Sequence, residues 1–183
     1  MSGATVLAKA IKDEGITIPI CFVGSHVSAL PLEVLKNESC VDLVLCNEGV
    51  YALWGLLKTD IRDTKELAQI KGIGYRKNDR PVLTAPEQVV PQHRIDIDLP
   101  GYAWDLLPYN KKPLDLYRSH FWHAEYDHGK RTPFVAIYTS LGCTFRCDFC
   151  MINVLNRNDN APIGVAANYS KMRFWSPDFI INE

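Results

Sequence analysis

The chain has 183 residues, of which 47% are hydrophobic, and its 20 Lys and Arg residues nearly balance 21 Asp and Glu residues for a formal net charge of −1. This length accommodates one domain or two small ones, and this share of hydrophobic residues excludes a disordered chain. The balanced charge carries no electrostatic signature of a protein that binds nucleic acid or an anionic membrane.

The N-terminal segment MSGATVLAKAIKDEG lacks the apolar core of a secretory signal, and no stretch of the sequence reaches the roughly 18 apolar residues of a membrane-spanning helix. We therefore expect a cytoplasmic protein. Because cytosolic thiols stay reduced, a cluster of cysteines in such a protein indicates a metal or catalytic site rather than a disulfide.

The first third of the chain alternates between helical and strand-like patterns. The predicted order is a helix over 4–14, a strand over 18–23, a helix over 31–36, a strand over 41–46 and a helix after residue 49. Both strands are continuous apolar runs, which are typical of parallel strands covered on both faces. The alternation predicts an α/β fold with a parallel sheet, and such sheets bind ligands at the carboxyl ends of their strands. Gly24–His26 and Asn47–Gly49 follow those ends.

The middle of the chain predicts a hairpin and then a linker. GIGYRKNDRPVLT, residues 72–84, contains two extended pieces that flank a polar turn. From 85 to about 131 the chain is rich in proline, aromatic and polar residues. Because Trp104 and Trp122 in this stretch need burial, we expect a linker that wraps over neighbouring structure.

The last part of the chain places three cysteines behind a predicted strand. Residues 133–139 form an apolar run, GCTFRCDFC follows at 142–150, and Ser176 begins a further predicted helix. Three thiolates are one fewer than the four ligands that complete a structural zinc site or an iron–sulfur site. A 4Fe–4S cluster held by three cysteines leaves one iron able to bind a small molecule, and thiolates favour such soft metal centres.

Cys143, Cys147 and Cys150, with Phe149 and the preceding strand, resemble the cluster-binding signature of the radical S-adenosylmethionine (radical SAM) superfamily. The resemblance implies that the cysteines hold a 4Fe–4S cluster, that the open iron binds SAM and that Phe149 lies near the adenine. It also implies reductive cleavage of SAM to a 5′-deoxyadenosyl radical, with electrons from a reductant such as flavodoxin or ferredoxin. The segment 172–183 is similar to the stretch that follows the cluster loop in many members.

A second resemblance lies in the N-terminal part. Residues 18–50 are similar to the later half of the cobalamin-binding domain of cobalamin-dependent radical SAM proteins, and DLPGYAWDLLPY, residues 98–109, is similar to the interdomain linker of that group. This resemblance implies that cobalamin is bound by Gly24, His26, Glu48 and Gly49. The Asp-x-His-x-x-Gly motif, which supplies the cobalt ligand in many such domains, does not occur in the sequence, although some relatives bind cobalamin without it.

Together the resemblances imply an α/β fold in which a partial Rossmann-like (flavodoxin-like) cobalamin-binding domain precedes the start of a radical SAM partial (β/α) barrel. The expected domains are the C-terminal part of the α/β domain at 1–75, the hairpin and interdomain linker at 76–132 and the N-terminal part of the radical SAM core at 133–183. A full eightfold barrel takes roughly 200 residues or more. We therefore expect a fragment of a methyltransferase-like radical SAM enzyme, truncated at both ends and too short for full activity.

Two organisations are open for such a fragment. A second chain could supply the rest of the barrel, or the chain could be a catalytically inactive iron–sulfur and cobalamin-binding module or subunit. A structural zinc protein is a further alternative, because the three clustered thiols could hold a zinc ion or no metal.

Alternatives also stand beside the remaining candidate residues. His26 could hydrogen-bond the backbone, and Glu48 could favour a helix N-terminus through its charge. Cys21 and Cys46 lie in apolar strands, where a free cysteine behaves as a small hydrophobic residue. The histidines of the linker match no strong metal-ligand spacing and are expected in surface or packing roles: His120, His123 and His128.

Overall fold

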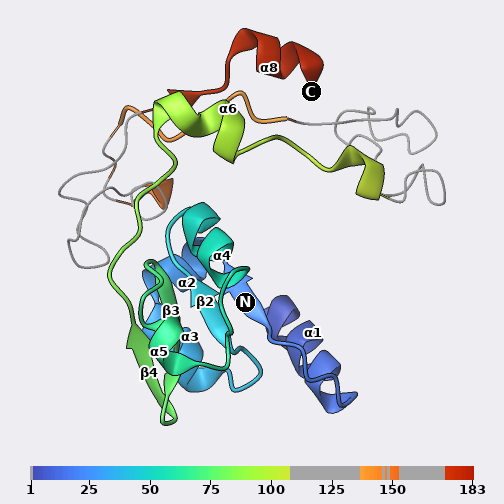
Figure 1. Ribbon diagram of the computed structural model, residues 1–183, viewed down its shortest axis with the longest axis vertical. Coiled ribbons are helices and arrows are strands. Elements are labelled where there is room, and N and C mark those ends of the chain that lie inside the picture. Colours follow the sequence, from blue (N-terminus) through green and yellow to red (C-terminus); the bar gives the residue numbers. More distant parts are fainter. Residues whose placement is uncertain (1, 108–136, 146, 148, 153–171) are drawn as a thin grey trace.

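The structure, a computed structural model, describes residues 2–107, 137–145, 147, 149–152 and 172–183 (Figure 1). Its larger sheet has four strands in the order of the sequence: β1 (Cys21–Val23), β2 (Leu43–Leu45), β3 (Ile73–Lys77) and β4 (Arg80–Leu83). β1 and β2 are parallel, whereas β3 is antiparallel to β2 and β4 to β3. The predicted α/β class and the parallel pair are confirmed, and the sheet as a whole is mixed.

Five helices are described in this first part of the chain: α1 (Ser2–Asp13), α2 (Ser25–Ala29), α3 (Pro31–Asn37), α4 (Val50–Leu56) and α5 (Thr64–Leu67). The predicted helices over 4–14, over 31–36 and after residue 49 are confirmed. Pro31 stands in the first turn of α3, where its missing N–H costs no hydrogen bond. The sequence analysis did not predict α2 or α5, which span only five and four residues.

The hairpin predicted over 72–84 is confirmed as β3 and β4. Asn78 and Asp79 form its two-residue turn with positive φ angles of 51° and 61°, the geometry of a type I′ turn. Because β3 also pairs with β2, the hairpin continues the larger sheet. The expected boundary between residues 75 and 76 falls inside β3.

Apolar side chains cover both faces of β2. On one face, Leu43 and Leu45 belong to a buried cluster with residues of α4, α5 and β3. On the other face, Val44 belongs to a second cluster with residues of α2 and α3. This alternation explains why the sequence over 41–46 is a continuous apolar run, since each successive side chain of a strand points to the opposite face.

β1 differs from the expectation that both of its faces are covered. Phe22 packs against the cluster under α2 and α3, but Val23 is 60% exposed and Cys21 is also exposed. β1 has one neighbour in the described sheet and lies at its edge, and Cys21 and Val23 point to the face opposite Phe22. An ion pair of 2.8 Å between Lys12 and Asp42 ties α1 to the start of β2.

The second part of the described chain contains short elements. They are the 3₁₀ helices η1 (Gln92–Arg94) and η2 (Trp104–Leu106), the helices α6 (Ile95–Asp98) and α8 (Pro177–Asn182), and the antiparallel strands β5 (Ser140–Leu141) and β6 (Arg173–Phe174). The strand predicted over 133–139 is wrong in its described part, because 137–139 is not a strand and β5 begins at Ser140. Residues 133–136 lie outside the described residues. The helix predicted from Ser176 is confirmed, with the Ser176 hydroxyl accepting from Phe179 N at 3.1 Å.

The segment 172–183 lies along the first part of the linker. Figure 1 shows α8 beside α6, at one end of the molecule and away from the larger sheet. Trp175 Nε1 donates to Leu99 O at 3.0 Å, and Ser176 N donates to Asp96 Oδ1 at 3.0 Å. These hydrogen bonds join residues 96–99 of the expected linker to the C-terminal segment, whereas Trp104 is only half-buried and Leu106 is 77% exposed. Residues 108–131 lie outside the described residues, so the wrapping of the linker stays a prediction. Among the helices that the structure describes, none has the length and apolar character required to cross a bilayer.

Candidate functional site

The two strand-end turns lie next to each other at the carboxyl edge of the parallel pair. Ser28 on α2 accepts a hydrogen bond from Asn47 N at 2.9 Å through its hydroxyl oxygen. Asn47 adopts a positive φ of 60°, and its Nδ2 donates to Glu87 O at 3.4 Å. The structure thus brings together Gly24–His26 and Asn47–Gly49, as the strand order predicts.

Both turns depend on glycine for their backbone conformation. Gly24 has φ +129° and ψ −176°, a region that residues with a Cβ essentially never occupy. Gly49 has φ +76° and is buried, and a Cβ there would lie 3.3 Å from Leu45 Cβ and from Val23 Cγ2. A Cβ on Gly24 would meet no atom of the described residues within 4 Å. Gly24 therefore leaves open space beside the turn, whereas Gly49 permits close packing.

His26 lies in the first turn of α2 with its side chain exposed. Its backbone oxygen accepts from Leu30 N at 2.9 Å, which closes the end of that short helix. The imidazole therefore stands at the surface of the strand-end edge, close in sequence to the open space at Gly24.

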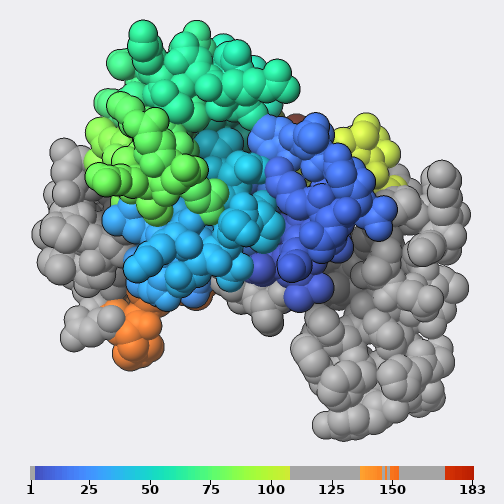
Figure 2. Space-filling model, turned by 90° about the horizontal axis from the view of Figure 1, so that it is seen from below, coloured from blue at the N-terminus to red at the C-terminus, as the bar shows by residue number. Residues whose placement is uncertain are grey.

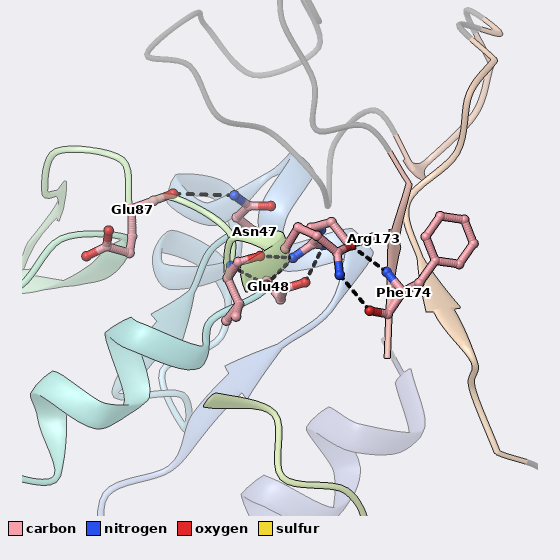
Figure 3. Close-up of polar contacts among 7 residues, drawn as sticks. Asn47, Glu48, Glu87, Arg173 and Phe174 are labelled. Atoms are coloured by element: carbon pink, nitrogen blue, oxygen red, sulfur yellow. Dashed lines mark hydrogen bonds and ion pairs between the residues drawn. The ribbon is translucent and has the colours of Figure 1, made fainter. Parts of the chain in front are cut away.

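Glu48 forms a buried ion pair with Arg173 of β6 (Figure 3). Arg173 Nη2 donates to Glu48 Oε1 at 2.6 Å, and Arg173 Nη1 donates to Oε2 at 3.1 Å. The Arg173 and Glu48 side chains are only 5% and 13% exposed. Two parallel hydrogen bonds between guanidinium and carboxylate make this pair both strong and geometrically specific.

The same pair also holds the start of the linker. Val90 N donates to Glu48 Oε2 at 2.8 Å, and Arg173 Nη1 donates to Val90 O at 2.6 Å. One residue further along β6, the Gln92 side-chain amide donates to Phe174 O and accepts from Phe174 N, both at 2.8 Å. Glu48 therefore joins three segments that are distant in the sequence, and both of its carboxylate oxygens accept hydrogen bonds.

A second polar contact connects α4 to α6. Tyr51 donates its hydroxyl hydrogen to Asp98 Oδ2 at 2.7 Å, and Arg94 pairs with Asp98 Oδ1 at 2.6 Å. Burial, and then the hydrogen bond to Asp98, raise the pKa of Tyr51 to about 12. The hydrogen bonds from Arg94 and Tyr51 lower the pKa of Asp98 below its usual value.

The cysteine loop begins directly after β5. Gly142 follows β5 with φ +88°, and Cys143 Sγ accepts from Phe145 N at 3.4 Å. Cys150 N donates to Cys147 O at 3.0 Å, which forms a turn between the last two cysteines. Figure 2 shows atoms of the described 137–152 segment, in orange, at the molecular surface.

None of the three loop cysteines forms a disulfide. Cys147 is exposed, and Cys143 and Cys150 are half-buried. Phe149 is 93% exposed. The described residues contain no group of three or more His, Cys, Asp or Glu side chains placed to hold a metal ion, so the structure does not bring the three sulfurs into one such group. The thiol chemistry nevertheless fits a soft metal centre, and a metal often gathers its ligands only when it binds.

The other cysteines have different surroundings. Burial raises the pKa of the Cys46 thiol to about 11, so this group stays protonated at neutral pH. A raised pKa makes the reactive thiolate form of Cys46 rarer than that of an ordinary cysteine. This agrees with the interpretation of Cys46 as a small hydrophobic residue.

Sequence reasoning missed three side chains that hold this region together: Arg173, Gln92 and Asp98. The available signal was weak. Arg173 stands between Met172 and Phe174 in an apolar stretch, where a charged residue needs a buried partner. That partner, Glu48, lies 125 residues away in the sequence, so no local pattern identifies it.

The chain is similar to a curated protein described as a methyltransferase. No family model matches the chain. A curated protein of Pyrococcus horikoshii, described as an uncharacterized methyltransferase, is 29% identical to the chain over 150 residues. The match covers 82% of this chain and 28% of that protein, so the chain spans about a quarter of its relative's length.

Proposed function

We propose that the chain is part of a methyltransferase-like radical SAM protein, in which Cys143, Cys147 and Cys150 hold a 4Fe–4S cluster. The observation that carries the proposal is the spacing of three cysteines, none of them in a disulfide, in a loop that directly follows a strand. The similarity to a protein described as a methyltransferase supports the use of SAM. When bound, the cluster would supply a site for SAM and the electron that cleaves it.

The residues of this chain would hold and orient these groups. Phe149, which is 93% exposed beside Cys150, offers an aromatic face for the adenine of SAM. Cobalamin would bind at the strand-end edge, beside the open space at Gly24 and the exposed His26. Gly49 would support this edge by close packing, and Glu48 would do so through Arg173.

Anaerobic reconstitution with iron and sulfide tests the cluster. We expect about four iron and four sulfide ions per chain, with the broad absorption of an iron–sulfur centre. The variant in which Cys143, Cys147 and Cys150 are all replaced by serine should lose this uptake. The matched control replaces Cys21, Cys40 and Cys46 by serine and should retain it.

Three other results would overturn parts of the proposal. A colourless protein with one tightly bound zinc ion would show that the loop is a structural zinc site and not a cluster site. Equal iron uptake by the two triple variants would show that the loop cysteines do not bind the iron. If the cluster forms but reduction in the presence of SAM yields no 5′-deoxyadenosine, the chain is a binding module or subunit rather than an enzyme.

Cobalamin binding is tested separately by mixing the chain with hydroxocobalamin and measuring the retained cofactor by its absorption. We expect binding that weakens in the variant Gly24→Leu, whose side chain would enter the open space beside the turn. Gly15→Leu, which also has a positive φ and open surroundings but follows α1, is the control for backbone strain. Retention that is equal in these two variants would contradict a site at this edge.

A further inference from the structure

The strand that leads into the cysteine loop is too short to hold itself in place. β5 and β6 pair over only two residues each, Ser140 with Phe174 and Leu141 with Arg173. Two-stranded pairings are at best marginally stable in water without packing against other structure. The register of β5, and with it the direction in which the chain enters the loop, therefore depends on what holds β6, in addition to the hydrogen bond that Tyr138 N donates to the Tyr102 hydroxyl at 3.1 Å.

β6 is held by side chains of the larger sheet unit and of the linker. Arg173 is 4% exposed and gives its guanidinium to Glu48 and to Val90 O. The Gln92 side-chain amide donates one hydrogen bond to Phe174 O and accepts one from Phe174 N, so it stands where a neighbouring peptide group would stand in a sheet. Of these contacts, only the one between Arg173 and Glu48 is both buried and charged. Its loss would therefore cost the most free energy.

We propose that Glu48 and Arg173 are positioning residues for the cysteine loop. Arg173 is paired with Leu141, and Cys143 comes two residues after Leu141. The ion pair anchors β6 to the turn after β2, β6 fixes β5, and β5 sets the point from which Cys143 enters the loop. The other end of the pair lies in the Asn47–Gly49 turn, so the same contact links the strand-end edge to the loop.

This inference rests on the proposed function in one respect, because that function makes the loop a cluster site. The positioning itself is measurable in the metal-free chain, in which Cys143 can be alkylated and the amides of β5 and β6 can exchange with deuterium. A failure of cluster uptake would overturn the proposed function without affecting this measurement.

The experiment compares Glu48→Gln and Arg173→Met with the control Lys12→Met in the full metal-free chain. Lys12 also forms an ion pair, but it joins α1 to Asp42 and touches neither β5 nor β6. We expect alkylation of Cys143 and exchange of the peptides covering 138–143 and 173–176 to accelerate at least about tenfold in the first two variants, because each leaves a buried charge unpaired. Both rates should stay at the wild-type level in the control.

Two further measurements separate positioning from a general loss of stability. The double variant Glu48→Gln with Arg173→Met leaves no unpaired charge, so the larger sheet should keep its exchange protection while β5 and β6 stay unprotected. When reconstituted with iron, this variant should take up the metal more slowly than the Lys12→Met control and show an altered absorption spectrum.

Three results would overturn the inference. The first is wild-type alkylation and exchange in Glu48→Gln and Arg173→Met. The second is a double variant whose β5 and β6 are as protected as those of the wild type. The third is a Lys12→Met control that accelerates as much as the ion-pair variants, because the effect would then report overall destabilisation.

Discussion

Single glycines in the two neighbouring turns of the strand-end edge have different surroundings, one packed closely and one beside open space. Gly24 and Gly49 both have positive φ angles, but only Gly49 is enclosed by neighbouring side chains. Glu48, between Asn47 and Gly49, turns its carboxylate toward Arg173. The residues that the family resemblance assigns to cobalamin therefore have distinct physical roles in the structure.

The backbone of Gly24 makes a prediction at this scale. We expect Gly24→Ala to lower the free energy of unfolding by about 1–3 kcal/mol, because alanine is strained at this φ and ψ even though space for its Cβ is available. Gly3→Ala, inside α1, should instead leave stability unchanged or raise it by up to about 1 kcal/mol. Urea unfolding measures both variants, and a Gly24→Ala chain as stable as the wild type would contradict the assigned strain.

At the scale of elements, one arginine joins the hairpin to a helix. Arg76 on β3 donates to Val41 O at 2.6 Å and to Glu38 O at 2.8 Å, and it also donates to Leu35 O. Leu35 lies in α3, and Glu38 follows its last residue. The guanidinium thus satisfies carbonyl groups at the end of α3, which have no partner within the helix.

Removal of this contact gives a prediction for the element. We expect Arg76→Met to lower the free energy of unfolding by about 1.5–3 kcal/mol, the usual range for hydrogen bonds to a charged group. Arg80→Met, at the exposed start of β4, should change it by less than about 0.5 kcal/mol. Chemical unfolding followed by circular dichroism tests the pair, and equal effects in the two variants would show that Arg76 does not secure α3.

At the scale of the whole molecule, polar contacts join segments that the sequence separates widely. Glu48–Arg173 joins the larger sheet to β6, and Tyr51–Asp98 joins α4 to α6. The Glu183 carboxylate accepts from Tyr102 N at 2.9 Å, so the end of the described chain also rests on the linker. The elements in the second part of the chain are short. These contacts therefore hold that part in place against the rest of the chain.

The Tyr51–Asp98 contact predicts a dependence of stability on alkaline pH. The pKa of Tyr51 in the folded chain, about 12, lies above the ordinary value of about 10 for a free tyrosine. The folded state therefore favours the protonated phenol, and this contribution is complete below about pH 10 and is lost as the pH rises from 10 to 12. Tyr51→Phe cannot titrate and should lack that part of the loss. Urea unfolding across this pH range measures the difference, and parallel pH profiles for the two proteins would disprove the linkage.

Much of the local structure was predictable because short-range patterns govern it. The helix over 4–14, the apolar strand at 41–46, the type I′ hairpin and the helix after Ser176 follow from periodicity, turn residues and capping within a few positions. The strand near the cysteine loop was misplaced, because β5 consists of two residues whose pairing with β6 is set more than 30 positions away. Contacts of that length have no local signal.

The sequence alone determined the α/β class, the order of the main elements and the three thiols in one loop, since these depend on residue type and spacing. The tertiary structure decided that β3 joins the sheet in the antiparallel direction and that Glu48 pairs with Arg173. The physical reason is that a buried charge requires a partner of opposite sign, but its place in the chain is chosen only when the segments pack together.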